Sequence, residues 1–316
     1  MMERKIGKVA IIGAGKMGSG IGLEFACNGH PVVMQSRHDN TLDNAMATVR
    51  EYLNLMVEAQ MISSTSAEKA LGNISTTKDM DRAVKDADHV VESVPEDLVL
   101  KQEIFARLDE LCPAEVSLAT NSSTMRAADC ALKVRRYPQR ILITHYWHPA
   151  PFIPLVEVIG SNRTDTEVLE RVAGMLRGMH KKVVLQKLEL PSGPAGWGNA
   201  LQQPMENIAR KLIDEKGCDP RIVDDIIKFG FGRRLSLAAI FMRYDLTGLD
   251  FFYDAAKARG SEPWGPIKER VERNEMGAKS GKGFYDWPGD SAAKFNRYFN
   301  LSLIQMLKKD IERGDL

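Results

Sequence analysis

The segment "IGKVAIIGAGKMGSGIGLEFACNGH", residues 6–30, decides the fold of the first half of the chain. Residues 6–12 are a short, apolar, β-branched run that predicts a buried strand, and residues 18–30 predict a helix that ends near Gly29. A glycine turn joins them, and its residues are Gly13, Gly15, Lys16, Met17 and Gly18. Such a turn lets the backbone close on a pyrophosphate at the positive end of the helix. We therefore predict a dinucleotide site here, the alternative being a tight turn with a structural role only.

Strand and helix patterns alternate from this segment to about residue 190. Further strands are predicted at 31–37, 88–94, 116–120, 140–146 and 155–160, with helices at 39–71 and 96–111 and a last helix and strand within 168–186. This alternation predicts an α/β fold, with a doubly wound, Rossmann-type domain over residues 1–190 whose parallel sheet is covered on both faces. Residues 191–316 instead show helical patterns at 197–216, 219–230, 235–257 and 264–275, which predict an all-α domain.

Composition excludes several classes of function. The 316 residues include 43 basic and 42 acidic side chains, and a net charge of +1 provides no field that would hold a nucleic acid. No run approaches the ~20 apolar residues of a membrane helix, and the start leads directly into a strand without a signal peptide. We expect a cytoplasmic protein. Its cysteines show neither metal-ligand spacing nor a disulfide framework, so no metal site is predicted; they are Cys27, Cys112, Cys130 and Cys218.

The end of the second predicted strand bears on the choice of dinucleotide. An NAD site usually has an acidic residue here that binds the ribose hydroxyls, whereas this chain has Ser36 and Arg37. A serine hydroxyl can donate to a 2′-phosphate, and a guanidinium can pair with it as a planar fork. We therefore expect NAD(P) as cofactor, with NADP(H) favoured over NAD(H). The alternative for Arg37 is a solvated surface charge.

A histidine and a glutamate stand on either side of a proline-rich bend in "ITHYWHPAPFIPLVEVIG", residues 143–160. If the two flanking strands pair, the midpoint between His145 and Glu157 is residue 151, inside the bend, so the two residues are cross-strand partners. A carboxylate opposite an imidazole fixes its tautomer and suits its other nitrogen for taking a proton from an alcohol. The alternative is a core histidine satisfied by a glutamate. Ligands of open α/β sheets bind at the carboxyl ends of strands, which favours a base beside a hydride acceptor, as in a dehydrogenase.

At these residues the sequence resembles the L-3-hydroxyacyl-CoA dehydrogenase family, which has L-gulonate and L-carnitine dehydrogenases and λ-crystallin among its relatives. The stretch HYWHPAPFIPLVEV is similar to the family's His-aromatic-aromatic-Asn-Pro…Leu-Val-Glu-Val, with the same twelve-residue step. This resemblance implies that His145 and Glu157 are the catalytic dyad. Asn-Ser-Ser-Thr at 121–124 is similar to the family's Asn-Thr-Ser-Ser and implies a substrate-binding role for Ser123.

Further motifs extend the resemblance over residues 6–287. Pro-Ala-Gly-Trp-Gly-Asn at 194–199 has the spacing of the family's Pro-Gly-Phe-Ile-x-Asn and implies that Asn199 contacts substrate. Val-Pro-Glu-Asp-Leu at 94–98 and the lysine that follows are similar to the segment beside the nicotinamide, which implies cofactor contacts for Pro95, Glu96 and Lys101. Residues 248–250 and 279–285 match other signatures. Ser123 could instead be a turn hydroxyl and Asn199 a helix cap.

The resemblance implies an NAD(P)-dependent oxidoreductase that interconverts a 3-hydroxyacyl group, as its CoA thioester, and the 3-keto form. It also implies a homodimer formed through the helical domain. His148 stands where the family has Asn, and Trp197 adds an aromatic residue near the expected pocket. These departures keep a small free hydroxy or keto acid open as substrate, and a non-catalytic, crystallin-like protein is the alternative of another class. Arg233 and Arg234 could meet a substrate anion or face water or a partner subunit.

Overall fold

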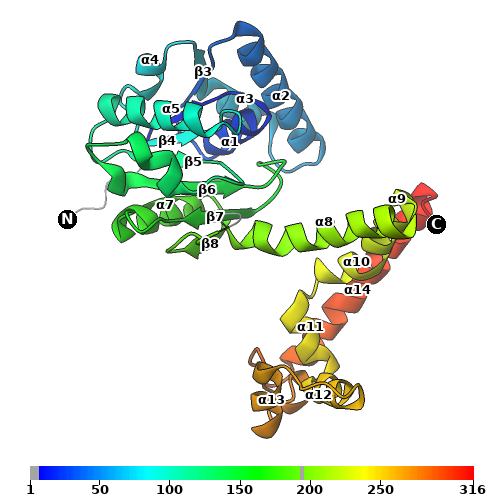
Figure 1. The fold of residues 1–316 in the computed structure, drawn as a ribbon. Helices are drawn as coiled ribbons and strands as arrows, with labels where there is room; N and C mark the ends of the chain where they lie inside the picture. Colours follow the sequence, from blue (N-terminus) through cyan, green and yellow to red (C-terminus); the bar gives the residue numbers. More distant parts are fainter. Residues whose placement is uncertain (1–6, 193–195) are drawn as a thin grey trace. The chain divides into compact units, whose positions relative to one another are not determined.

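The structure, a computed structural model, describes residues 7–192 and 196–316 (Figure 1). Pro194 and Ala195 of the predicted junction motif lie outside the described residues. The chain divides into two compact units, Met1–Met205 and Glu206–Leu316. The prediction from the sequence instead put the boundary near residue 190. We describe each unit by itself, as the sheet unit and the helical unit.

The sheet unit is built around eight strands in the order β3-β2-β1-β4-β5-β6-β7-β8 (Figure 1). The first six are parallel, β7 runs antiparallel to β6, and β8 is parallel to β7. The order 3-2-1-4-5-6 is that of dinucleotide-binding sheets, which confirms the predicted fold class. The strands are β1 (Val9–Ile12), β2 (Val32–Gln35), β3 (Ile74–Thr77), β4 (His89–Glu92), β5 (Ser117–Thr120), β6 (Ile141–Tyr146), β7 (Leu155–Ile159) and β8 (Lys182–Gln186).

Helices cover both faces of this sheet and enclose two hydrophobic cores. One face carries α1 (Lys16–Cys27), α2 (Asp39–Glu58), α3 (Ser64–Gly72) and α7 (Thr166–Gly178). The other carries α4 (Met80–Val84), α5 (Leu98–Leu111), α6 (Ala127–Cys130) and the 3₁₀ turn η1 (Ala131–Lys133). A second 3₁₀ turn, η2 (Pro138–Arg140), directly precedes β6. Strands β1, β4 and β5 are buried along their whole length, which explains why they are continuous apolar runs or carry buried polar groups with partners.

Two features of this unit differ from the sequence prediction. The predicted helix 39–71 is two helices, because Gln60 adopts a left-handed backbone conformation with φ 57° and Ser63 caps α3 by accepting a hydrogen bond from the Ser66 amide. Strand β3 and helix α4 were not predicted. Residues 74–77 read Ile-Ser-Thr-Thr and lie at the edge of the sheet, so they lack the apolar pattern of a buried strand.

The helical unit continues from α8 and matches the predicted all-α character. The predicted helix 235–257 breaks at Gly248, whose φ of 104° ends α11 and starts α12. The final helix, α14, was not predicted. The elements are α8 (Trp197–Lys216), α9 (Pro220–Asp225), the π-helical turn η3 (Ile226–Phe231), α10 (Gly232–Leu235), α11 (Ile240–Thr247), α12 (Leu249–Ala258), α13 (Gly265–Glu272), the 3₁₀ turn η4 (Ala278–Ser280) and α14 (Ser291–Arg313).

Buried carboxylates hold the helical unit together. Asp245, fully buried, accepts hydrogen bonds from the amides of Phe284 and Tyr285 at 2.9 and 2.8 Å and from the Trp287 indole at 2.9 Å. These bonds tie the end of the 279–285 signature to α11. Arg233 forms an ion pair with Asp310 of α14, so it has a structural partner inside its own unit. Within the described part of the chain, no helix has the length and apolar composition to cross a bilayer.

His89 in β4 makes stability depend on pH. It is fully buried, its Nδ1 lies 2.8 Å from Ser117 Oγ, and burial, aided by the charge of Arg171, lowers its pKa to about 3. The folded state therefore excludes a proton that the unfolded chain binds below pH ~6.5.

We predict that this group alone removes about 1.4 kcal/mol of the free energy of unfolding between pH 7.5 and 5.5. Urea unfolding at the two pH values measures the loss, and a His89→Gln variant should lack this part of it. Equal pH dependence in the two proteins would contradict the assignment.

Candidate active site

The β6–β7 hairpin brings the predicted histidine and glutamate together. The strand register pairs His145 with Glu157, and His145 Nδ1 donates to Glu157 Oε2 at 2.8 Å. Both side chains are buried, with 6% and 2% of their surface exposed. The predicted cross-strand pairing is therefore confirmed. Because Nδ1 carries the proton in this bond, the lone pair of Nε2 is free to accept one.

Glu157 is held as a carboxylate. Burial alone would raise its pKa, but hydrogen bonds from His145 and from the Gly198 amide, at 2.8 Å, outweigh burial and lower the pKa below its usual value. The amide comes from the first turn of α8, where the helix dipole also favours a negative charge. A carboxylate ionised at neutral pH can stabilise an imidazolium that forms beside it.

The other two predicted substrate residues lie at the same place. Ser123 Oγ lies 3.1 Å from His145 Nε2, and the Asn199 side-chain amide donates to the Ser123 carbonyl at 2.7 Å. The structure thus brings together His145, Glu157, Ser123 and Asn199, from two strands, one loop and one helix. Asn199 bonds a loop carbonyl here, so it does not act as a cap of α8.

Glu96 holds the serine turn in place. Its carboxylate accepts from the Ser122 hydroxyl at 2.9 and 2.8 Å and from the Ser123 amide at 3.0 Å. Asn121 Oδ1 accepts from the Tyr146 amide at 2.9 Å and ties the same turn to β6. The sequence analysis included Asn121 in the 121–124 motif but gave it no role, although its position at the end of β5, directly before the two serines, could have indicated one.

Lys101 lies elsewhere than in the nucleotide cleft. It is almost fully buried, and its ammonium donates to both Glu92 oxygens at 2.8 and 3.1 Å and to the Val94 carbonyl at 3.2 Å. Glu92 also accepts from the Thr120 hydroxyl at 2.7 Å. Through its bond to the Val94 carbonyl, this buried ion pair holds the loop that follows β4. The cofactor contact that the resemblance implies for Lys101 stays a prediction.

A cleft of about 520 Å³ opens along the carboxyl ends of β1, β2 and β4. Five of the predicted cofactor residues line it: Gly13, Gly15, Ser36, Arg37 and Pro95. Lys16, Met17 and Gly18 form the adjoining first turn of α1. Glu96, like Lys101, is absent from the residues that line the cleft.

The turn at the mouth of this cleft fits a pyrophosphate. Gly13 has a φ of 100°, and a Cβ there would lie 2.6 Å from the Ser93 carbonyl oxygen. A Cβ on Gly18 would lie 2.0 Å from the Gly13 oxygen, so neither position admits a side chain. Helix α1 starts with no acidic residue in its first turn and no side-chain cap, which leaves its positive end open to phosphate oxygens.

Helix α5 contributes a wall of the cleft that sequence reasoning missed. Leu100, Ile104 and Arg107 line it and recur at four and three residues, so they lie on one helix face. That spacing, on a helix that follows a strand end, was the available signal. Arg107 is also bound to Asp81 at 3.0 and 3.1 Å.

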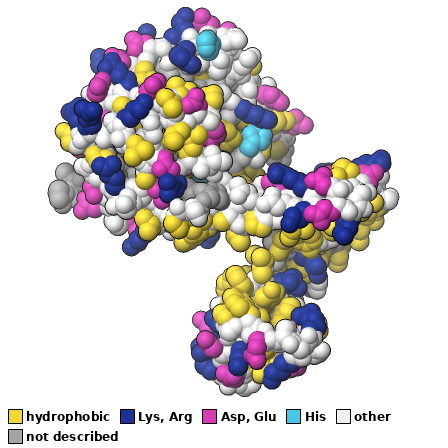
Figure 2. Space-filling view, viewed as in Figure 1, with side chains coloured by type: hydrophobic (Ala, Val, Ile, Leu, Met, Phe, Trp, Pro, Cys, Tyr) yellow, Lys and Arg dark blue, Asp and Glu magenta, His cyan; other side chains and the backbone are white. Residues whose placement is uncertain are grey.

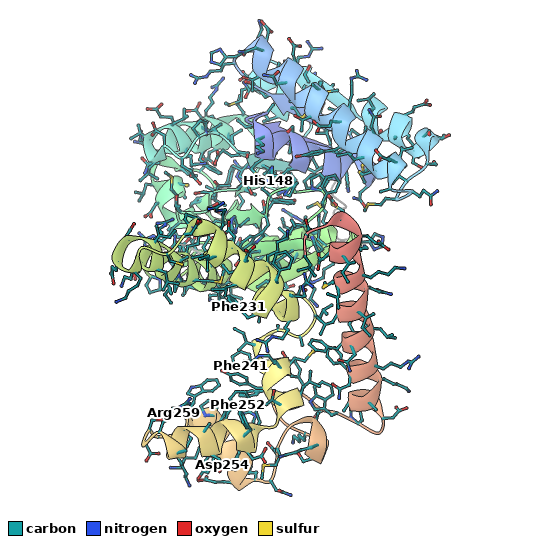
Figure 3. The ribbon with its side chains drawn as sticks, turned by 90° about the vertical axis from the view of Figure 1, so that its right-hand side faces the viewer. His148, Phe231, Phe241, Phe252, Asp254 and Arg259 are labelled. Atoms are coloured by element: carbon teal, nitrogen blue, oxygen red, sulfur yellow. The ribbon has the colours of Figure 1, made fainter. Side chains whose placement is uncertain are left out.

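The two departures from the family pattern lie at exposed positions of the sheet unit. His148 is exposed on the bend between β6 and β7 and is marked in Figure 3. Trp197, the first residue of α8, has 48% of its surface exposed. The bend itself is fixed by the buried Lys181, whose ammonium donates to the carbonyls of Ala150 and Ile153 at 2.9 and 3.1 Å.

Comparison with known proteins finds similarity in both parts of the chain. The family model described as 3-hydroxyacyl-CoA dehydrogenase, NAD binding domain, matches residues 8–188, and the one described as 3-hydroxyacyl-CoA dehydrogenase, C-terminal domain, matches residues 197–287. A 3-hydroxybutyryl-CoA dehydrogenase of Clostridioides difficile is 30% identical over 289 residues, which are 89% of this chain and 99% of that protein.

Two further relatives agree. The mitochondrial hydroxyacyl-coenzyme A dehydrogenase of Sus scrofa is 28% identical over 292 residues, 88% of this chain and 90% of its own. The crystal structure of a 3-hydroxyacyl-CoA dehydrogenase from Archaeoglobus fulgidus superposes with a TM-score of 0.76 at 30% identity, over 95% of this chain and 98% of that one. Residues 288–316, which contain α14, lie beyond both family models.

Removing the Lys101 charge tests whether this residue stabilises the fold through Glu92 or contacts the cofactor. We predict that Lys101→Met lowers the free energy of unfolding by about 3 kcal/mol, because it leaves a buried carboxylate without its cation. Lys133→Met, which removes an exposed lysine 3.7 Å from Glu103, is the matched control and should change stability little. Chemical denaturation measures both. Unchanged stability of Lys101→Met together with weakened cofactor binding would instead support direct cofactor contact.

Proposed function

The chain belongs to the 3-hydroxyacyl-CoA dehydrogenase family, and from that premise we propose that it interconverts a 3-hydroxyacyl group and its 3-keto form, with His145 as general acid and base. The family and the relatives are dehydrogenases that act on a hydroxyl group with a nicotinamide cofactor. The observation that carries our proposal is the Glu157–His145–Ser123 chain of contacts in a unit that also has the pyrophosphate turn.

The residues of the site divide the chemistry among them. In the oxidation direction His145 Nε2 takes the hydroxyl proton, while Glu157 stabilises the imidazolium and keeps the ring oriented. The Ser123 hydroxyl lies 3.1 Å from Nε2, so it would hold the reacting oxygen next to that nitrogen. Asn199 fixes the backbone of Ser123 through its hydrogen bond to the Ser123 carbonyl. A nicotinamide bound along the cleft supplies the acceptor for the hydride. In the reduction direction His145 returns the proton.

An intact acid–base pair argues against a purely structural protein. A crystallin-like role needs only the fold and the nucleotide turn, whereas here two buried polar side chains are aligned with a serine hydroxyl at the end of β6. Glu157 alone would satisfy a structural histidine, so the further contact of His145 Nε2 with the Ser123 hydroxyl favours catalysis.

We predict that His145→Gln lowers kcat by about 10²–10⁴-fold while cofactor binding survives, because the variant lacks the base but keeps the cleft. The assay follows NADH or NADPH absorbance with acetoacetyl-CoA, and cofactor fluorescence reports binding. Near-normal turnover by this variant would refute the assignment.

The CoA thioester is the substrate class that the relatives support, since the Clostridioides difficile protein is named for 3-hydroxybutyryl-CoA. A small free hydroxy or keto acid is the second candidate, because exposed His148 and Trp197 replace the family's residues beside the site. The same assay with free acetoacetate in place of acetoacetyl-CoA separates them.

Cofactor choice rests on the end of β2. Ser36 and Arg37 line the cleft where an NAD enzyme usually presents a carboxylate, and Arg37 is exposed. We propose that NADP(H) is preferred, through pairing of the guanidinium and the hydroxyl with the 2′-phosphate.

Removing the Arg37 charge tests this preference. Arg37→Ala should weaken NADPH binding by roughly 10–100-fold and NADH binding little, because a charge-assisted hydrogen bond contributes about 1.5–3 kcal/mol. Fluorescence titration of both cofactors measures the ratio. Tighter binding of NADH than of NADPH by the unaltered protein would contradict the proposal.

We also propose a homodimer. In the helical unit hydrophobic side chains gather at the surface (Figure 2). On α14 a row of large ones is 45–62% exposed: Leu301, Ile304, Leu307 and Ile311. Phe241 of α11, labelled in Figure 3, and Phe251 of α12 are exposed as well. So much apolar surface is unusual for a monomer.

Ile304→Asp should convert the dimer into monomers in sedimentation velocity experiments, because a charge on this face opposes burial. Lys309→Asp, an exposed site on the opposite side of the same helix, is the control. A monomeric unaltered protein would contradict the proposal.

A further inference from the structure

We propose that Trp147 and Gly198 are positioning residues, whose contact docks the first turn of α8 on Glu157 so that one carboxylate both orients His145 and places Asn199. The inference rests on the proposed function, because it names residues that act on the reaction through His145 and Asn199. Neither Trp147 nor Gly198 was singled out from the sequence.

The two oxygens of Glu157 bind two different parts of the site. Oε2 accepts from His145 Nδ1 and Oε1 accepts from the Gly198 amide, both at 2.8 Å. Gly198 directly precedes Asn199, whose amide reaches the Ser123 carbonyl at 2.7 Å. A shift of the Gly198 amide away from Glu157 therefore moves the next residue away from Ser123. The carboxylate is the shared anchor of the base and of the substrate-side loop.

Trp147 makes this anchor possible only with glycine at position 198. Its ring stands beside that of His145, with centroids 5.3 Å apart and planes at 51°. A Cβ on residue 198 would lie 2.5 Å from Trp147 Cζ2 and 2.8 Å from Glu157 Oε2. Both distances are far below van der Waals contact, so any larger residue pushes α8 off the indole and the carboxylate. The indole therefore limits how closely the first turn of α8 can approach Glu157.

Trp147 is half-buried and packs against the ring of His145. Its Nε1 is buried and interacts with the Glu157 carboxylate, whose pKa it helps to lower, and its neighbours on β6, His145 and Tyr146, are themselves buried. A displaced indole would press on the His145 ring. Interference at residue 198 should therefore reach the base by two routes, through Glu157 and through Trp147.

The effect should fall on turnover and spare cofactor affinity. The residues that line the nucleotide cleft belong to segments 12–15, 35–41, 80 and 93–107 and include neither Trp147 nor Gly198. Small errors of position at reacting atoms lower rates strongly, by up to ~10²-fold for about 1 Å. A lowered kcat with unchanged cofactor affinity is thus the signature of mispositioning.

The test is a double-mutant series: Gly198→Ala, Trp147→Phe and the two combined, with Gly174→Ala as control. Gly174 lies in α7 of the same unit, and a Cβ there meets nothing within 4 Å. The readouts are kcat and KM with acetoacetyl-CoA, cofactor fluorescence, and the low-field NMR resonance of the His145 Nδ1 proton, identified by its loss in His145→Gln.

We expect Gly198→Ala to lower kcat by at least about tenfold and to broaden or shift the Nδ1 resonance. Trp147→Phe removes the indole carbon that the added methyl group would strike but leaves Glu157 Oε2 2.8 Å from that methyl group, so the double variant should recover part of the lost kcat and stay below Trp147→Phe alone. If Gly198→Ala also lowers the fraction of folded protein, the double variant should likewise have a larger folded fraction than Gly198→Ala alone. Gly174→Ala should match the unaltered protein in all readouts.

A Gly198→Ala protein with unaltered kcat and an unaltered Nδ1 resonance would overturn the inference. So would a double variant no better than Gly198→Ala, because the loss would then come from something other than the indole. If the unaltered protein reduces no keto substrate, the proposed function fails, yet the NMR resonance still decides whether residues 147 and 198 set the His145–Glu157 contact.

Discussion

The hydrogen bond from His145 to Glu157 joins the strand register of the sheet unit to its chemistry. It exists because β6 and β7 are antiparallel neighbours that pair residue 143 with 159 and so bring 145 opposite 157. If the pairing of β6 with β7 shifted by one residue, the side chains of His145 and Glu157 would point to opposite faces of the sheet and could not meet. The bend between the strands is in turn fixed by buried Lys181, which bonds two of its carbonyls and pairs with Glu24 at 3.0 Å.

Around that bond the sheet unit separates two tasks. The cleft at the ends of β1 and β2 is made of backbone turns and of side chains from α5, and it suits a dinucleotide by shape and by the positive end of α1. The site at the ends of β5 and β6 is made of side chains that we propose exchange a proton with the substrate and hold its oxygen. Buried Glu92 and Lys101 lie beneath the loop after β4, which borders both. A turn that only glycine can adopt and a buried ion pair thus both contribute to the geometry of the cleft.

Much of this arrangement could be predicted from the sequence, because its signals are local or periodic. The spacing of the glycines at 13, 15 and 18 predicts where the nucleotide turn lies. The twelve-residue step across a proline bend predicts the pairing of His145 with Glu157. Other features depend on tertiary contacts that no short pattern carries. The edge strand β3 has one apolar residue, the partner of Lys101 is nine residues away on another element, and the fit of Trp147 to Gly198 joins positions 51 residues apart. Helix α14 is apolar on more than one face, so its role could not be read from periodicity.

The central claim is that an imidazole held by Glu157 serves as the base beside a bound nicotinamide. A crystal structure of the protein with the oxidised cofactor and a 3-hydroxyacyl ligand tests it most directly. The account predicts the ligand hydroxyl within hydrogen-bonding distance of His145 Nε2 and the Glu157 contact intact. A hydroxyl bound beyond reach of Nε2, or a His145 ring released from Glu157, would contradict it.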